Sequence, residues 1–161
     1  MKLSFYSMAV AVTVGLLSIA GFSLQVVASN ATDEAAIKDV LSSYETGLNA
    51  SDTKAVMPLY TEDAVLMPQA TPTVVGSKAV EQFYIGTFKA IKINLKFQIA
   101  EVQVVSNDWA FLRTTSTGTM KVLATGKEAP AQTQELFVLH KDSGQWKLAR
   151  YSFSSTQPAP M

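Results

Sequence analysis

Apolar residues recur with a helical period over residues 33–49. They fall three, four, seven and eleven positions after the first, which places them along one side of a helix. The residues on this stripe are Ile37, Val40, Leu41, Tyr44 and Leu48. Asp33 and Glu34 begin the segment, and their negative charge suits the positive end of a helix dipole. The pattern therefore predicts an amphipathic helix here.

Two shorter helices are expected farther along the chain. The first is capped by Ser51 or Asp52 and extends to Tyr60, with an irregular last turn at Pro58 because proline disturbs a helix interior. Ser77 caps the second helix. Its aromatic stripe consists of Phe83, Tyr84 and Phe88. We interpret this stripe as core, with one edge available to line a cavity.

The apolar period changes to two from Ile91 onward. Ile91, Ile93 and Leu95 alternate with polar residues, which is typical of a strand that is buried on one face. Further strands are expected over residues 64–67, 109–121, 132–141 and 145–154. Helices followed by antiparallel strands predict an α+β fold. We expect a cone-shaped, curved antiparallel or mixed β-sheet that wraps around three N-terminal helices and encloses a pocket.

The N-terminal segment has a composition of its own. Lys2 is the only charged residue before Asp33, and the residues between them are mostly apolar. A basic start, an apolar centre and a small residue at the end are typical of a secretory signal peptide. We expect this peptide to cover residues 1–28, with cleavage after Ala28 or, alternatively, after Ala31. The mature protein would then be periplasmic or secreted and free of the membrane. An uncleaved membrane anchor is the other interpretation.

Composition and charge exclude several classes of protein. The 13 basic and 13 acidic residues leave no net charge, whereas nucleic-acid binders usually carry a basic surplus. Cysteine is absent, so disulfides, thiolate nucleophiles and cysteine-based zinc sites are excluded. His140 is the single histidine and cannot form a two-histidine metal site. Since no glycine-rich strand–helix turn is present either, we expect no cofactor, no metal and no nucleic-acid partner.

The turn at residues 106–108 sets a register for the strands that flank it. Pairing Val105 with Trp109 places Glu101 opposite Arg113 and Phe97 opposite Thr117. In the last hairpin, pairing Lys141 with Trp146 places Phe137 opposite Arg150. Cross-strand partners share a face, so this register predicts an apolar inner face with an inserted polar set. The set consists of Glu101, Arg113, Glu135 and Arg150, and Thr115 lies on the same face.

Two alternatives to this polar site are open. Glu101–Arg113 and Glu135–Arg150 could be cross-strand ion pairs that only stabilise the rim of the sheet. A bulge near Ile99 would also move Glu101 to the other face.

The opposite face is predicted to be apolar. It would carry Val102, Val104, Ala110, Leu112, Leu136, Val138, Ala149, Tyr151 and Phe153. A sheet face that meets water should be polar, so we expect a second subunit to cover it in a homodimer. His140 would lie on this face, near a hairpin end, exposed to solvent.

Several stretches together resemble a known family. They are YTEDAVLMP from Tyr60, DWAFLRTTSTGT from Asp108 and ELFVLHKDSGQWKLARYSF from Glu135. In this order they resemble the SnoaL-like branch of the nuclear-transport-factor-2-like superfamily, in particular SgcJ/EcaC-type proteins, which are related to ketosteroid isomerases. The resemblance covers residues 32–155 and leaves a flexible tail at residues 156–161. It implies a pocketed cone that often dimerises through its sheet.

The resemblance guides the reaction only weakly. In the isomerase relatives a catalytic carboxylate precedes a proline, but this chain has Met67 before Pro68, and a thioether cannot accept a proton. We therefore expect an exported protein that binds a small apolar molecule. The expected ligand-binding residues are Arg113, Glu135, Arg150, Tyr60, Tyr44, Met67 and Thr115.

Three other functions are open. One is a cofactor-independent isomerase or lyase that uses Glu135 or Glu101 as base and Tyr44 or Tyr60 as donor. The second is the oxidoreductase activity sometimes attached to SgcJ/EcaC-type relatives, which no residue pattern here supports. The third is an accessory interaction protein with a filled cone.

Overall fold

A computed structural model describes residues 20–157, with side chains placed from residue 31 onward. Residues 1–19 of the expected signal peptide and residues 158–161 of the expected tail lie outside the described part. The first helix, α1, runs from Ala20 to Ala50 and contains the helix expected over residues 33–49. Within residues 20–157, no helix is both long enough and apolar enough to cross a membrane.

The two shorter helices differ from expectation at their ends. α2 covers Thr53–Val56, and the Asp52 side chain caps it by accepting hydrogen bonds from the backbone. The 3-10 helix η1, Met57–Leu59, follows at the proline. The helix expected as far as Tyr60 therefore ends early, because Tyr60 begins a strand. α3 covers Ser77–Ala90, but Gly76 occupies the cap position and no side chain bonds there. The prediction of a Ser77 cap is wrong.

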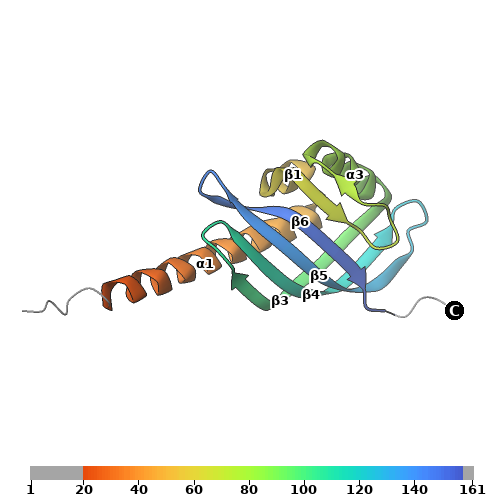
Figure 1. Ribbon diagram of the computed structural model, residues 1–161. Helices are drawn as coiled ribbons and strands as arrows, with labels where there is room; N and C mark the ends of the chain where they lie inside the picture. The colour runs from red at the N-terminus through yellow and green to blue at the C-terminus, as the bar shows by residue number, and fades with distance from the viewer. Residues whose placement is uncertain (1–19, 158–161) are drawn as a thin grey trace, which may run out of the picture.

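Six strands form one mixed sheet. They are β1 (Tyr60–Met67), β2 (Val74–Val75), β3 (Ile91–Val104), β4 (Trp109–Val122), β5 (Glu128–Asp142) and β6 (Gln145–Ser155). Their order in the sheet is β2-β1-β6-β5-β4-β3. β1 and β6 run parallel and the other neighbours antiparallel. The sheet curves around the helices on one side (Figure 1), which confirms the α+β cone.

Side chains of α1 cover the free edge of the sheet at β3. The Asn49 side chain accepts a hydrogen bond from the Leu95 amide at 2.8 Å and donates to the Leu95 carbonyl at 2.7 Å. Glu45 Oε2 accepts from the Phe97 amide at 2.8 Å. An edge strand exposes unpaired backbone groups, so these bonds both satisfy β3 and fix α1 against it.

A bulge in β3 decides which side chains face the helices. Phe97 pairs with Ser116, and the register shifts between Ile99 and Glu101 before Glu101 pairs with Arg113. The predicted Glu101–Arg113 pair is confirmed, whereas the predicted Phe97–Thr117 pair is wrong by one residue. The buried side chains of β4 are therefore Ala110, Leu112, Thr114 and Ser116. A bulge expels one residue from the ladder and so exchanges the two faces beyond it.

A second bulge lies in the last hairpin. Lys141 pairs with Trp146 and Leu139 with Leu148, as predicted, but the register shifts before Val138 pairs with Arg150. Phe137 therefore faces Tyr151 instead of Arg150.

Both bulges change the composition of the two faces. The outer apolar set predicted above is mostly wrong, because Ala110, Leu112 and Tyr151 are buried core residues and Val102, Val104 and Phe153 pack against the core. Leu136 and Val138 are on the outer face. Ala149, which sits at the bulge, is buried. His140 is half-buried and its ring lies 4.4 Å from that of Trp109.

Candidate functional site

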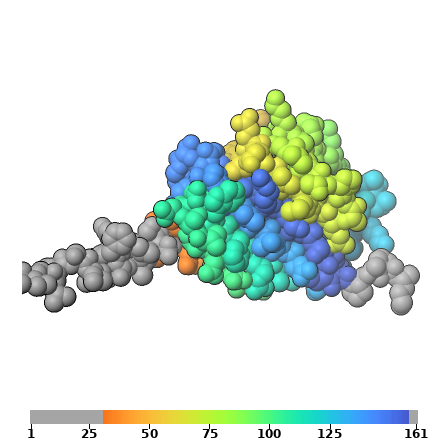
Figure 2. Space-filling view, in the orientation of Figure 1, coloured from red at the N-terminus to blue at the C-terminus, as the bar shows by residue number. Residues whose placement is uncertain are grey.

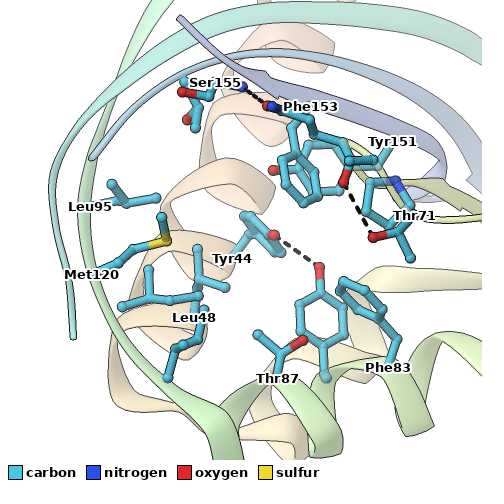
Figure 3. A pocket seen from close by; sticks show the side chains of 17 residues that line it. Tyr44, Leu48, Thr71, Phe83, Thr87, Leu95, Met120, Tyr151, Phe153 and Ser155 are labelled. Carbon is cyan, nitrogen blue, oxygen red and sulfur yellow. Dashed lines mark hydrogen bonds between the residues drawn. The ribbon is translucent and has the colours of Figure 1, made fainter. Parts of the chain in front are cut away.

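A cavity of about 400 Å³ opens between α1, α3, the sheet and the loop after β1. Most of its lining is apolar. Figure 3 shows Leu48, Leu95 and Met120 along one side and Phe83, Tyr151 and Phe153 along another. The volume lies within the usual range for small-molecule sites, which are mostly apolar with a few placed polar groups.

Three tyrosine hydroxyls form a continuous chain at this cavity. The Tyr84 hydroxyl lies 2.9 Å from that of Tyr44 and 2.7 Å from that of Tyr60. Tyr44 and Tyr84 line the cavity, whereas Tyr60 is buried behind them. The residues come from α1, β1 and α3, so the chain forms only when these elements pack together. Figure 3 marks the bond at the Tyr44 hydroxyl with a dashed line.

One hydroxyl proton of this chain takes part in neither of its internal hydrogen bonds. A phenol has one proton to donate, so three phenols supply three protons for two internal bonds. If Tyr60 donates to Tyr84, and Tyr84 and Tyr151 both donate to Tyr44, the Tyr44 proton remains for another acceptor. The site can therefore donate a hydrogen bond into an apolar space, where such a bond is stronger than in water.

These tyrosines stay protonated at neutral pH. Burial raises the pKa of Tyr44 to about 12, opposed by hydrogen bonds with Tyr84 and Tyr151 and supported by the nearby Glu135 carboxylate. Burial likewise raises the pKa of Tyr60, Tyr84 and Tyr151 well above the usual tyrosine value. The cavity thus presents neutral donors, not phenolates.

Glu135 lies on the inner face, 4% exposed, within a shell of hydroxyls. Thr114 donates to Oε2 at 2.5 Å and Ser116 donates to Oε1 at 2.9 Å. Thr133 also donates to Oε1. Of these residues, Thr133 lines the cavity. A buried carboxylate is costly unless it is hydrogen-bonded, and this shell supplies the bonds.

The loop after β1 closes one end of the cavity. Pro68, Gln69, Ala70 and Thr71 line it. The Gln69 side chain accepts a hydrogen bond from the Ser155 amide at the end of β6. Ala70 has a positive φ of 52°, which is unusual for a residue with a side chain.

The structure brings together only part of the predicted site. Tyr44 lines the cavity, Tyr60 and Glu135 support it from behind, and all three lie among the helices and the inner face. Arg113 and Thr115 are exposed on the outer face, so the prediction that they face inward is wrong. The reason is the β3 bulge, which gives the inner positions to Thr114 and Ser116.

Arg150 and Met67 also lie away from the cavity. Arg150 Nη2 pairs with Asp63 Oδ2 at 3.2 Å, and its Nη1 donates to the Asp63 carbonyl. Met67 pairs with Ser152, is 39% exposed and is not among the residues that line the cavity. Arg113 Nε bonds Glu101 Oε2 at 3.2 Å. Glu101 and Arg113 thus form a cross-strand ion pair, which agrees with the alternative given above for these two residues.

Sequence reasoning missed several residues of the site. The predicted register places Tyr151 on the outer face and does not single out Thr114, Ser116 or Thr133. The signal that could find them is the alternative of a bulge near Ile99, because such a bulge gives the inward positions of β4 to Thr114 and Ser116.

Comparison with known proteins identifies relatives of this arrangement. The SnoaL-like domain family matches residues 40–149. A ketosteroid isomerase-like protein from Erwinia carotovora atroseptica SCRI1043 is 38% identical, with a TM-score of 0.74 over 77% of this chain and 96% of that one. No functionally curated protein matches the chain.

More distant structures share the fold alone. A hexachlorocyclohexane dehydrochlorinase, LinA-type3, from Novosphingobium barchaimii LL02 is 12% identical, with a TM-score of 0.73 over 83% of this chain and 92% of that one. An NTF-2 like protein of unknown function from Shewanella oneidensis MR-1 is 20% identical, with a TM-score of 0.63 over 76% and 98% of the two chains.

Proposed function

The chain belongs to the SnoaL-like domain family, and on this premise we propose that its cavity binds a small, largely apolar molecule through one acceptor oxygen, such as a ketone. The observation that carries the proposal is the Tyr60–Tyr84–Tyr44 hydroxyl chain, which ends at an apolar cavity. When Tyr84 donates to Tyr44, the Tyr44 proton is left for a ligand. A few convergent polar groups in an apolar hollow are typical of a small-molecule site.

The proposal does not involve the arginines of the expected site. Arg113 and Arg150 pair with Glu101 and Asp63 instead. A carboxylate ligand would therefore meet no cation among the described lining residues, whereas a carbonyl would meet the neutral Tyr44 hydroxyl. A fused bicyclic ketone such as 1-indanone has the required combination of an apolar frame and one acceptor oxygen.

Calorimetric titration with 1-indanone and with indane, its analogue without oxygen, tests this proposal. We expect the ketone to bind about ten-fold more tightly, which corresponds to one hydrogen bond of about 1.4 kcal/mol. Tyr44→Phe should remove this preference and leave indane binding unchanged. Equal binding of the two compounds to the unmodified protein would refute the proposal.

Isomerase or lyase chemistry is a second candidate. It is favoured by the presence of a proton donor, Tyr44, close to a buried carboxylate, Glu135, because enolisation needs both a donor to the carbonyl and a base. Incubation of 1-indanone in D₂O, followed by NMR, measures exchange of the protons next to the carbonyl. Accelerated exchange that Glu135→Gln abolishes would favour catalysis. Exchange no faster than in buffer would favour a protein that binds the ketone without catalysing a reaction.

We also propose that the protein is exported. The support is the sequence pattern of residues 1–28, a basic start with an apolar centre and a small residue at the end. Intact mass of the protein recovered from the periplasm or medium tests this. A chain that begins at Ser29 is expected, and a full-length chain held in the membrane fraction would contradict it.

A further inference from the structure

A second polar position in the cavity restricts the chemical class of the ligand, an inference that rests on the proposed function. We propose that the cavity recognises a hydroxylated carbonyl compound, in which the carbonyl accepts from Tyr44 and the hydroxyl donates to Thr133. In this arrangement Glu135 acts as a positioning residue that fixes the direction of the hydrogen bond at Thr133.

The first step of the argument is the proton count around Glu135. Thr114, Ser116 and Thr133 each carry one hydroxyl proton, and all three donate to the two carboxylate oxygens. A carboxylate accepts and does not donate. Among the described residues, no lysine, arginine or histidine pairs with Glu135. These hydroxyl donors therefore stabilise the buried Glu135 carboxylate.

The second step concerns the Thr133 oxygen. Its proton goes to Glu135, and the Ser116 oxygen lies 2.5 Å from it on the protein side. Thr133 is half-buried and lines the cavity. A hydroxyl oxygen has two lone pairs, so at least one remains on Thr133 whether the single Ser116 proton goes to Glu135 or to Thr133. Toward the cavity Thr133 therefore offers an acceptor and has no proton to give.

The third step is the polarity of the whole site. Tyr44 offers a donor and Thr133 an acceptor, and both side chains line the same cavity. The remaining lining includes Leu48, Leu95 and Met120, on the side of the cavity away from Tyr151 (Figure 3). A ligand that fits both positions has a hydroxyl near its carbonyl on an apolar frame. A ligand with a second acceptor there would leave two acceptors face to face, which is costly in a buried site.

The test compares 1-indanone with its four ring-hydroxylated isomers (4-, 5-, 6- and 7-hydroxy-1-indanone) by calorimetry. We expect at least one isomer to bind about ten-fold more tightly than 1-indanone, the value of one added hydrogen bond. Thr133→Val should remove this gain, so that the variant binds the best hydroxyindanone no more tightly than it binds 1-indanone. Thr133→Ser keeps the hydroxyl and should keep the gain. If the valine variant does not fold, loss of the gain in Thr133→Ser would still overturn the inference.

Thr115→Val is the matched control, since Thr115 is exposed on the outer face of the neighbouring strand; it should keep the gain. If no isomer exceeds 1-indanone, or if the gain survives in Thr133→Val, the inference is overturned while the preference for ketone over indane still supports the proposed function. If ketone and indane bind equally but a hydroxyl gain depends on Thr133, the proposed function fails and the acceptor role of Thr133 stands.

Discussion

The Tyr84 hydroxyl lies 2.7 Å from the Tyr60 hydroxyl, and this contact makes Tyr84 the middle member of the buried chain that ends at Tyr44. The three residues come from α3, β1 and α1. One side chain therefore joins three elements that are far apart in the sequence.

Tyr84→Phe should destabilise the domain more than Tyr60→Phe does. The first change removes both hydrogen bonds and leaves the buried Tyr60 hydroxyl without this partner, whereas the second removes one bond. We expect a loss of about 2–3 kcal/mol for Tyr84→Phe and about 1 kcal/mol for Tyr60→Phe, measured by urea unfolding. Equal losses would show that the chain does not act as a connected unit.

Asp33→Asn should weaken the domain at neutral pH and not in acid. Asp33 accepts from Lys141 Nζ at 2.6 Å and Trp146 Nε1 at 3.0 Å. Burial raises the pKa of this carboxyl, but the bonds from Lys141 and Trp146 outweigh burial and leave the pKa below 3.8. The ionised form is therefore favoured in the folded state, so its stabilisation is present above pH 3.8 and is lost as the pH falls through the lowered pKa.

Urea unfolding at several pH values measures this effect. At pH 7 the expected loss for Asp33→Asn is about 2 kcal/mol, typical of hydrogen bonds to a charged group. Glu34→Gln is the matched control, since Glu34 is exposed and its contact with Lys38 is 3.6 Å long; it should cost under about 0.5 kcal/mol. A loss for Asp33→Asn that persists unchanged below the carboxyl pKa would contradict the charge-based explanation.

Alkali should destabilise the domain through its tyrosines. Tyr44 has a folded-state pKa of about 12 against 10 for an unperturbed tyrosine, raised by burial. A raised pKa means that the folded state holds the proton more strongly, so stability is complete below pH 10 and falls as the pH rises toward 12. Phenolate absorbance should therefore lag behind that of free tyrosine and then rise together with unfolding. Titration of all the tyrosines near their ordinary pKa, with the fold intact, would oppose this prediction.

The hairpin turns predict the strand pairing correctly near each turn and wrongly beyond each bulge. Glu101–Arg113 and Leu139–Leu148 pair as the turn residues imply. The sequence allows a bulge near Ile99 but does not decide whether it forms, because Ile99 and Ala100 both suit a regular strand. Helix stripes such as Ile37–Leu41–Tyr44 are local and predictable from the sequence, whereas the hydroxyl shell of Glu135 depends on the register of two strands, β4 and β5.

Glu135→Gln should change which ligands the cavity prefers. Glutamine keeps the size of the side chain but adds an NH₂ donor, so one of the three surrounding hydroxyls must accept a hydrogen bond from it. Thr133 then no longer has to donate its proton to residue 135. We expect the gain from the hydroxyl of the best hydroxyindanone to fall about ten-fold, with 1-indanone binding retained. Glu101→Gln, on the outer face, is the control. An unchanged gain in Glu135→Gln would remove Glu135 from ligand positioning.

Leu136→Glu should separate the homodimer that we propose to form through the outer sheet face. Leu136 is 45% exposed, and its cross-strand partners are Arg113 in β4 and Ser152 in β6. Phe111 and Val138 are the next cross-strand pair on the same outer face. Strands β4, β5 and β6 occupy the front of the domain in Figure 2, so this face is open to a second copy. The apolar area is smaller than the sequence implied, because the bulges turn Ala110, Leu112 and Tyr151 inward.

Light scattering coupled to gel filtration measures the effect. The unmodified protein should have twice the mass of one chain and Leu136→Glu the mass of one, because a buried unpaired carboxylate at an interface opposes association. Leu123→Glu is the matched control, since Leu123 is 48% exposed but lies in the β4–β5 connection; it should leave the dimer intact. A monomeric unmodified protein would refute the interface, and it would place the exposed Leu136 in contact with solvent instead of a partner.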